Sequence, residues 1–124
     1  AFFVRGLGAG EPQALALGEG IAMVTAHDPN DASSPRTRRH LPRFRATPPP
    51  DPGSGDWSAW IKLLADSTHD PAIGIAETLN VPPMNGFGTI CSSLLALGPA
   101  RQWLFCPGPP GSAPFAPVAL PAPA

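Results

Sequence analysis

The chain has 124 residues, a length that fits one small domain. It contains 19 prolines and 13 glycines, yet 43% of its residues are hydrophobic and they cluster in a few windows, which favours packed segments joined by proline-rich connectors. The formal net charge of −1 argues against a dedicated nucleic-acid-binding domain. No apolar run approaches the ~18 to 20 residues that span a bilayer. We therefore expect no nucleic acid and no membrane among the partners of this chain.

The first segment, Ala1 to Arg5, has no charged residue before its apolar ones, so it does not read as a secretory signal peptide, and we expect a cytoplasmic protein. Two cysteines, Cys91 and Cys106, are too few for a disulfide framework or a Cys-rich zinc site. A single bridge between them stays open, and two reduced thiols are favoured in the absence of a secretory signal. The three histidines match no compact metal-ligand spacing, so we expect no metal and no cofactor; they are His27, His40 and His69.

The first third of the chain predicts strands followed by a helix. Residues 14–17 and 21–25 read as two strands around a Gly-Glu-Gly turn, and residues 2–4 as a further strand. Ser34 followed by Pro35 is typical of a helix start, with the serine as N-cap and the proline in the first turn. The helix is expected to run through Arg45, with Pro42 kinking or ending it.

The rest of the chain predicts a linker, a second helix and a hairpin. In the second helix, capped by Asp56, four apolar side chains share one face at helical spacing and Asp66 marks the end; they are Trp57, Trp60, Ile61 and Leu64. Residues 72–78 fit a short helix or a strand equally well. Residues 89–97 read as a strand, returned by a turn to a partner strand at 102–106.

This order of elements predicts an α+β fold, with two helices on a mostly antiparallel sheet. We expect a single domain over residues 1–118 that contains a proline-rich linker at 47–55. Residues 119–124 are expected to form an extended or disordered tail.

Few residues carry a chemical signal on their own. Five arginines lie between positions 36 and 45; they fit an anion site through bidentate contacts, but the solvated face of an amphipathic helix is the favoured interpretation. Cys91 lies in the middle of a predicted strand, where a thiol is usually a small core residue and not a nucleophile. Residue types and spacings alone therefore name no reaction.

The order of five short motifs is more informative. They are V-T-A-H-D at 24–28, S-S-P-R-T at 33–37, W-S-A-W-I-K-L-L-A-D at 57–66, G-F-G-T-I-C-S-S-L-L-A-L at 86–97 and W-L-F-C-P-G-P-P-G-S-A-P-F at 103–115. In this order they resemble the C-terminal portion of N-terminal-nucleophile (Ntn) amide hydrolases and acyltransferases, in particular the isopenicillin N acyltransferase-like (C45 peptidase) family. The resemblance implies the C-terminal half of an αββα sandwich.

The resemblance also implies a chemistry and a set of residues. The family uses an N-terminal cysteine as nucleophile, with its own α-amine as base. Carried over to this sequence, Arg36 is the catalytic candidate that supports the nucleophile. Thr25 matches the threonine of the family's T-N pair, and Ala26 stands where the oxyanion-stabilising asparagine is expected. Thr89 and Ser92 match a strand that lines the substrate pocket.

The nucleophile itself has no counterpart here, since residue 1 is Ala and neither cysteine is at the matching position. We therefore expect a second polypeptide that carries the N-terminal nucleophile half, and a small-molecule acyl substrate. The predicted function is a subunit or fragment of an Ntn-type acyltransferase or amide hydrolase that acts on an acyl amide or thioester. The alternative is a non-catalytic binding or structural module of the same fold.

Overall fold

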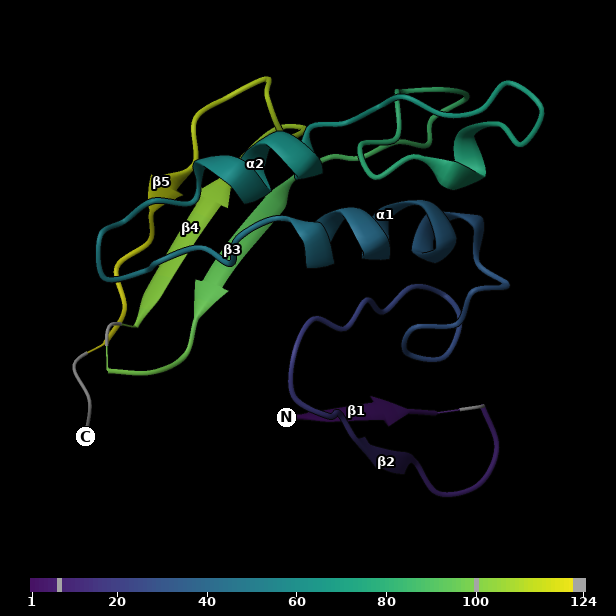
Figure 1. Ribbon diagram of the computed structural model, residues 1–124, viewed down its shortest axis with the longest axis horizontal. Coiled ribbons are helices and arrows are strands. Elements are labelled where there is room, and N and C mark those ends of the chain that lie inside the picture. Colours follow the sequence, from purple (N-terminus) through teal and green to yellow (C-terminus); the bar gives the residue numbers. More distant parts are fainter. Residues whose placement is uncertain (7, 100, 122–124) are drawn as a thin grey trace.

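A computed structural model describes residues 1–6, 8–99 and 101–121. The fold is mixed α+β, as the sequence predicts, with two helices and antiparallel sheets (Figure 1). The elements in chain order are β1 (Phe2–Arg5), β2 (Gln13–Ala16), α1 (Pro35–Ala46), α2 (Ser58–Leu64), the 3-10 helix η1 (Ile75–Glu77), β3 (Ser92–Ala96), β4 (Gln102–Cys106) and β5 (Ala116–Pro117).

The larger sheet has the order β3-β4-β5, and both of its pairings are antiparallel. The β3–β4 pair is the predicted hairpin, with Ser92 opposite Cys106 and Ala96 opposite Gln102. β3 is shorter than the strand expected at 89–97. The short strand β5, in the proline-rich tail, was not predicted, because proline lacks the N–H that a strand interior needs.

A separate hairpin pairs β1 with β2, with Phe3 opposite Leu15. The strand predicted at residues 2–4 is therefore confirmed. The strand predicted at 21–25 is wrong: these residues form no strand, and β2 pairs with β1 instead of with them. Local hydrophobicity alone does not make a strand, because the partner of a strand is set by the rest of the fold.

Helix α1 begins as predicted, with Pro35 in its first turn and the Ser34 hydroxyl accepting a hydrogen bond from the Thr37 N–H at 3.3 Å. The helix runs through Arg45 as predicted. Of the two effects expected of Pro42, a kink or an end, the end is wrong, because α1 continues to Ala46. Pro42 is exposed, so its ring meets solvent on the outer face. Its missing N–H removes the hydrogen bond that Arg38 O would accept within the helix.

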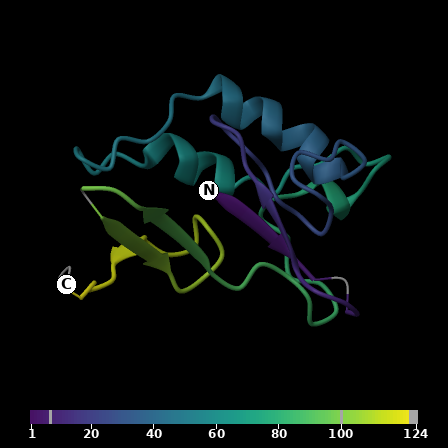
Figure 2. The same ribbon diagram turned by 90° about the horizontal axis from the view of Figure 1, so that it is seen from below.

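The helices pack on one face of the larger sheet, which Figure 2 shows from the side. Trp57, just before α2, is 5% exposed, and its Nε1 donates to Gln102 Oε1 of β4 at 3.0 Å. Phe44 of α1 meets Trp60 of α2 edge to face, with ring centroids 5.2 Å apart. Together with Leu41 and Leu94, these side chains form the core between helices and sheet.

Some predicted segments lie outside regular elements. The linker at 47–55 includes a turn closed by the Gly55 N–H to Asp51 O at 3.1 Å. Cys91 is exposed and precedes β3, so its predicted core position is wrong. Both cysteines are free thiols. In the 119–124 tail, 119–121 belong to no strand and 122–124 fall outside the described residues. Within the described ranges no helix is long and apolar enough to cross a membrane.

Candidate functional site

Two of the five residues implied by the resemblance meet in one cavity. Thr25 and Arg36 both line a hollow of about 330 Å³ between the segment Ile21–Thr25, the helices and β3. Its walls are mostly apolar, and among the lining residues Arg36 alone carries a charge. The remaining lining side chains are Phe44, Trp57, Trp60, Leu64, Leu79, Ser93, Leu94 and Leu95.

Arg36 projects from the first turn of α1, where the serine cap fixes the direction of the helix. Its Nε donates to the Thr78 carbonyl oxygen at 2.6 Å, a contact that holds the half-buried side chain in place. Among the described residues, Nη1 and Nη2 of Arg36 have no hydrogen-bond partner, so their N–H groups are free to donate to an anion. Arg36 is therefore a positioned cation at an apolar cavity.

Two of the other arginines of α1, Arg39 and Arg43, contact the segment 66–78 instead of the cavity. Arg38 and Arg45 are exposed and reach the Ala32 and Ile21 carbonyl oxygens, each at 3.4 Å. Arg39 Nη1 lies 3.0 Å from Glu77 Oε2, and Arg43 pairs with Asp66. Glu77 is 5% exposed and also accepts the Asp70 N–H at 2.8 Å. These ion pairs fasten α1 to the 66–78 segment, so the role of Arg39 and Arg43 is structural. Arg38 and Arg45 keep the exposed positions expected of a solvated helix face.

His40 completes this arrangement and is fully buried. Its Nε2 lies 2.8 Å from Glu77 O and its Nδ1 lies 3.0 Å from Arg43 Nη1. Burial lowers the pKa of His40 below its ordinary value; the Glu77 carbonyl opposes this, and nearby Arg43 adds to it. Burial acts to raise the pKa of Asp66, but hydrogen bonds from Thr68 and Arg43 outweigh it and lower that pKa.

Three predicted residues lie away from the cavity lining. Ala26 is exposed beside Thr25. The Thr89 hydroxyl accepts the Val81 N–H at 2.9 Å, which ties two loop segments together. Ser92 is half-buried opposite Cys106 at the start of β3. The next residue along the strand, Ser93, lines the cavity instead.

Sequence reasoning missed several residues at the cavity. Trp60 was assigned to the helix face that packs on the core, yet it also lines the cavity, and its buried Nε1 has no acceptor among the described residues. Leu95 is 59% exposed on β3. Ser93 and Leu95 are both exposed on β3, whereas Leu94 between them is buried. An exposed leucine is the signal that could have marked this surface, but exposure is not readable from one sequence.

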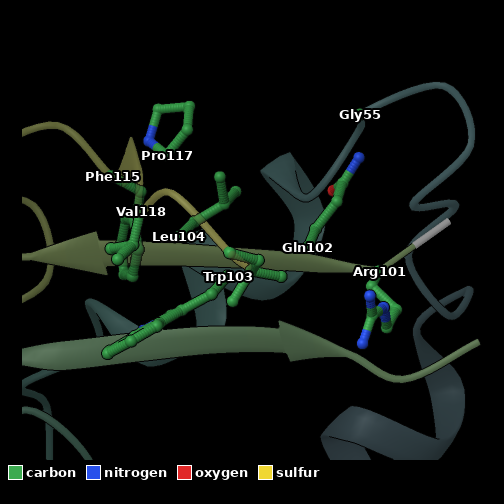
Figure 3. Close-up of a pocket in the computed structure, with 9 residues that line it drawn as sticks. Gly55, Arg101, Gln102, Trp103, Leu104, Phe115, Pro117 and Val118 are labelled. Carbon is green, nitrogen blue, oxygen red and sulfur yellow. The ribbon is translucent and has the colours of Figure 1, made fainter. Parts of the chain in front are cut away.

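A second cavity, of about 480 Å³, lies against β4 and β5 (Figure 3). In the figure Arg101 and Gln102 lie at one end and Phe115 and Val118 at the other. The Gln102 amide is already engaged, donating to Pro52 O at 2.6 Å. No residue implied by the resemblance lines this cavity, and its described lining includes no thiol, hydroxyl or carboxylate. The Arg36 cavity, which has hydroxyl groups as well as a cation in its lining, is therefore the better candidate site.

Comparisons of the chain with protein-family models, with curated proteins and with solved structures gave no match. The described residues also bring together no group of three or more His, Cys, Asp or Glu side chains that could hold a metal ion.

Proposed function

We propose that this chain is a subunit or fragment of an Ntn-type acyltransferase or amide hydrolase, and that a partner polypeptide supplies the nucleophilic cysteine. The single observation that supports the proposal most is that Thr25 and Arg36, which the resemblance assigns to one site, line the same apolar cavity. The finer fold, the C-terminal half of an αββα sandwich, is part of the proposal.

The chemistry assigns a role to each side. The partner's terminal amine takes the thiol proton, and the thiolate attacks the acyl carbonyl carbon. The tetrahedral oxyanion collapses, the C–N bond breaks, and the amine leaves with the proton, which produces a thioester. Water or another acceptor then releases the acyl group. Neither Cys91 nor Cys106 lines the cavity, so this chain itself brings no thiol to it.

The described residues of this chain supply a cation, a hydroxyl and an apolar wall. Arg36 is a positioning residue. The Thr78 carbonyl oxygen holds its Nε, and its Nη1 and Nη2 are the donors that would meet the partner's terminal residue. Ala26 has no side-chain amide, so the oxyanion needs another donor. The Thr25 hydroxyl accepts the His27 N–H at 3.2 Å and keeps its own proton to donate. The apolar wall fits the hydrocarbon part of an acyl group.

The test uses the complex that accompanies this chain from its native source. Native mass spectrometry shows whether a second polypeptide is bound and whether it begins with cysteine. The complex is then incubated with a panel of acyl 4-nitroanilides and quenched. One acyl group on the partner's terminal peptide is the expected result, with 4-nitroaniline released.

Arg36→Ala is expected to slow acyl-enzyme formation about 10- to 100-fold, because a misplaced nucleophile costs that much. The loss falls mainly on kcat, and Arg36→Lys restores part of it. Arg39→Gln is the matched control: it loosens the same 66–78 segment at Glu77 without lining the cavity, so it lowers stability and leaves acylation unchanged.

The alternative function is a non-catalytic binding module of the same fold, which Ala26 and the missing thiol favour. The binding-module function replaces the enzymatic one if the complex forms no acyl adduct, or if the partner begins with none of Cys, Ser or Thr. Equal acylation by the Arg36→Ala and wild-type complexes contradicts the role given to Arg36.

A further inference from the structure

The side of β3 that faces away from β4 has unused backbone groups. The Val118 N–H donates to Trp103 O at 2.8 Å, so Trp103 presents its backbone groups to β5. Backbone groups alternate along a strand, and Leu104 therefore faces β3, where it pairs with Leu94. Ser93 and Leu95 consequently present their N–H and C=O groups on the other side, which we name the open edge. No backbone hydrogen bond to these groups occurs within residues 1–6, 8–99 and 101–121.

The two edges of this sheet differ in a way that matters for pairing. The edge formed by β5 is two residues long and ends in Pro117, which has no N–H to donate. β3 is five residues long, Ser-Ser-Leu-Leu-Ala, with no proline and no charge. Natural proteins protect edges with proline, charge or shortness. β5 has such protection and β3 has none, which is typical of an edge that pairs.

The open edge borders the Arg36 cavity. Ser93 and Leu95 line it on one side, and the segment Ile21–Thr25 lines it as well. In Figures 1 and 2, β3 is the strand of its sheet that lies nearest the β1–β2 hairpin, so the open edge faces the N-terminal part of the chain. Leu95 is 59% exposed there. The cavity thus combines a row of backbone groups with apolar walls.

These features specify the chemistry of the occupant. A row of alternating donors and acceptors is satisfied by an extended polypeptide, as in strand addition to a sheet edge. Apolar walls favour apolar side chains at alternate positions of that strand. Arg36, the one charge in the lining, favours an acidic group. The buried Trp60 Nε1, which has no acceptor among the described residues, is a further unsatisfied donor at this wall.

We infer that the open edge of β3 receives an extended strand of a partner polypeptide, hydrogen-bonded to Ser93 and Leu95, with an acidic group against Arg36. The inference rests on the proposed function for the existence of a partner chain. Pairing itself involves no acyl transfer, so a binding measurement and an acylation measurement fail independently.

The probe is a blocked, labelled peptide of about nine residues that alternates valine and threonine and carries one aspartate. Amide hydrogen exchange is measured by NMR on the dilute chain with and without the peptide, and binding is followed by fluorescence anisotropy. The peptide is expected to slow exchange of the Ser93 and Leu95 amides at least about 10-fold. The Leu94 amide, already bonded to β4, is the internal reference.

Leu95→Pro removes only the outward N–H and is expected to lose binding, whereas Leu95→Val keeps it. Because Leu95→Pro could misfold, a second comparison leaves the chain unchanged and alters the peptide instead. Its backbone amides are N-methylated at alternate positions, either on the side that pairs with β3 or on the opposite side. Methylation of the pairing edge abolishes binding, and methylation of the opposite edge does not. Arg36→Gln is expected to weaken binding about 10-fold, to the level of a peptide with asparagine in place of aspartate.

Three outcomes overturn the inference. The first is that the Ser93 and Leu95 amides are protected equally with and without peptide in the dilute chain. The second is that both N-methylated peptides bind alike. The third is protection that rises with chain concentration in the absence of peptide, which assigns the edge to a second copy of this chain.

Discussion

His40 lies buried between α1 and the 66–78 segment, and its two ring nitrogens have different partners. The Glu77 carbonyl oxygen only accepts, so Nε2 carries the proton that it receives at 2.8 Å. The Arg43 guanidinium only donates, so Nδ1 accepts at 3.0 Å. Both contacts require the neutral ring. A second proton would break the Arg43 contact and place a charge beside two arginines, Arg39 and Arg43.

This geometry predicts an acid-sensitive fold. The pKa of His40 is lowered from 6.5 in the folded chain, so the unfolded chain takes up the proton first as pH falls. The His40 contribution to stability is therefore complete above about pH 6.5 and declines below it, by at most about 1.4 kcal/mol for each pH unit. Urea unfolding between pH 7.5 and 5 measures this decline.

Two variants isolate the effect. His40→Gln removes the decline along with some stability, whereas His69→Gln, at an exposed position, leaves the decline in place. Asp66 acts in a separate window: its lowered pKa keeps its contribution intact above about pH 4, and that contribution is lost only in stronger acid. A decline that persists unchanged in His40→Gln contradicts the assignment.

At the scale of elements, local signals determine where α1 begins, and tertiary contacts determine how far it continues. Its start is set locally, by the Ser34 cap and by Pro35. Its continuation past Pro42 is set by contacts on both sides of the proline. His40, Leu41 and Phe44 are all buried, so ending the helix at Pro42 would remove Phe44 from the core.

Pro42→Ala is expected to raise the unfolding free energy by about 1 to 2 kcal/mol. Alanine restores an N–H to Arg38 O and removes the ring, and the greater freedom of the unfolded chain offsets part of the gain. Equilibrium urea unfolding measures it. Pro48→Ala, at an exposed position outside the helix, is the matched control and should gain nothing. A loss of stability in Pro42→Ala would contradict this account.

Elements defined by nearby residues were predicted well, and elements defined by distant pairing were not. The β3–β4 hairpin follows from its turn, α1 from its Ser34 cap and α2 from its helical spacing. The N-cap expected at Asp56 is wrong, because Trp57 is the N-cap of α2 and makes no side-chain cap hydrogen bond. Residues 21–25 have the same apolar character as a strand, yet they line a cavity beside β3 without pairing. A strand needs a partner as well as a pattern, and the partner of β2 proved to be β1, upstream in the chain.

The whole molecule has a thin core and many apolar side chains at its surface. In the part of the chain that the structure describes, the buried hydrophobic residues are Leu41, Phe44, Trp57, Val81, Leu94 and Cys106. Ile90 is 81% exposed and Phe2 74%. A domain with so little buried apolar area is marginal on its own, and a partner that covers more of this surface would stabilise it by mass action.

The two cysteines report on this stability. Cys91 is exposed and Cys106 is 0% exposed, with its Sγ 3.1 Å from Gly108 O. We expect one thiol per chain to react rapidly with 5,5′-dithiobis(2-nitrobenzoate), and the second only as the chain opens. The slow phase measures opening directly. Cys91→Ser should remove the fast phase alone.

Partner binding should slow the Cys106 reaction further, in proportion to the partner concentration above its dissociation constant. Two fast thiols in the native chain would show that the β4 end of the core is not closed. An unchanged slow phase in the partner complex would show that partner binding does not stabilise the core around Cys106.

The sequence by itself determined the local features of this protein: where α1 begins, which side of the segment Trp57–Leu64 carries the tryptophans, and where the second hairpin turns. These depend on caps, spacing and turn residues within a few positions of one another. The resemblance carried by the order of its motifs proposed five site residues, and two of them, Thr25 and Arg36, line one cavity. Only the tertiary structure brought these two to one cavity. It also placed two arginines of the cluster, Arg39 and Arg43, in ion pairs with the 66–78 segment and left one edge of β3 open, because long-range packing decides which side chains meet.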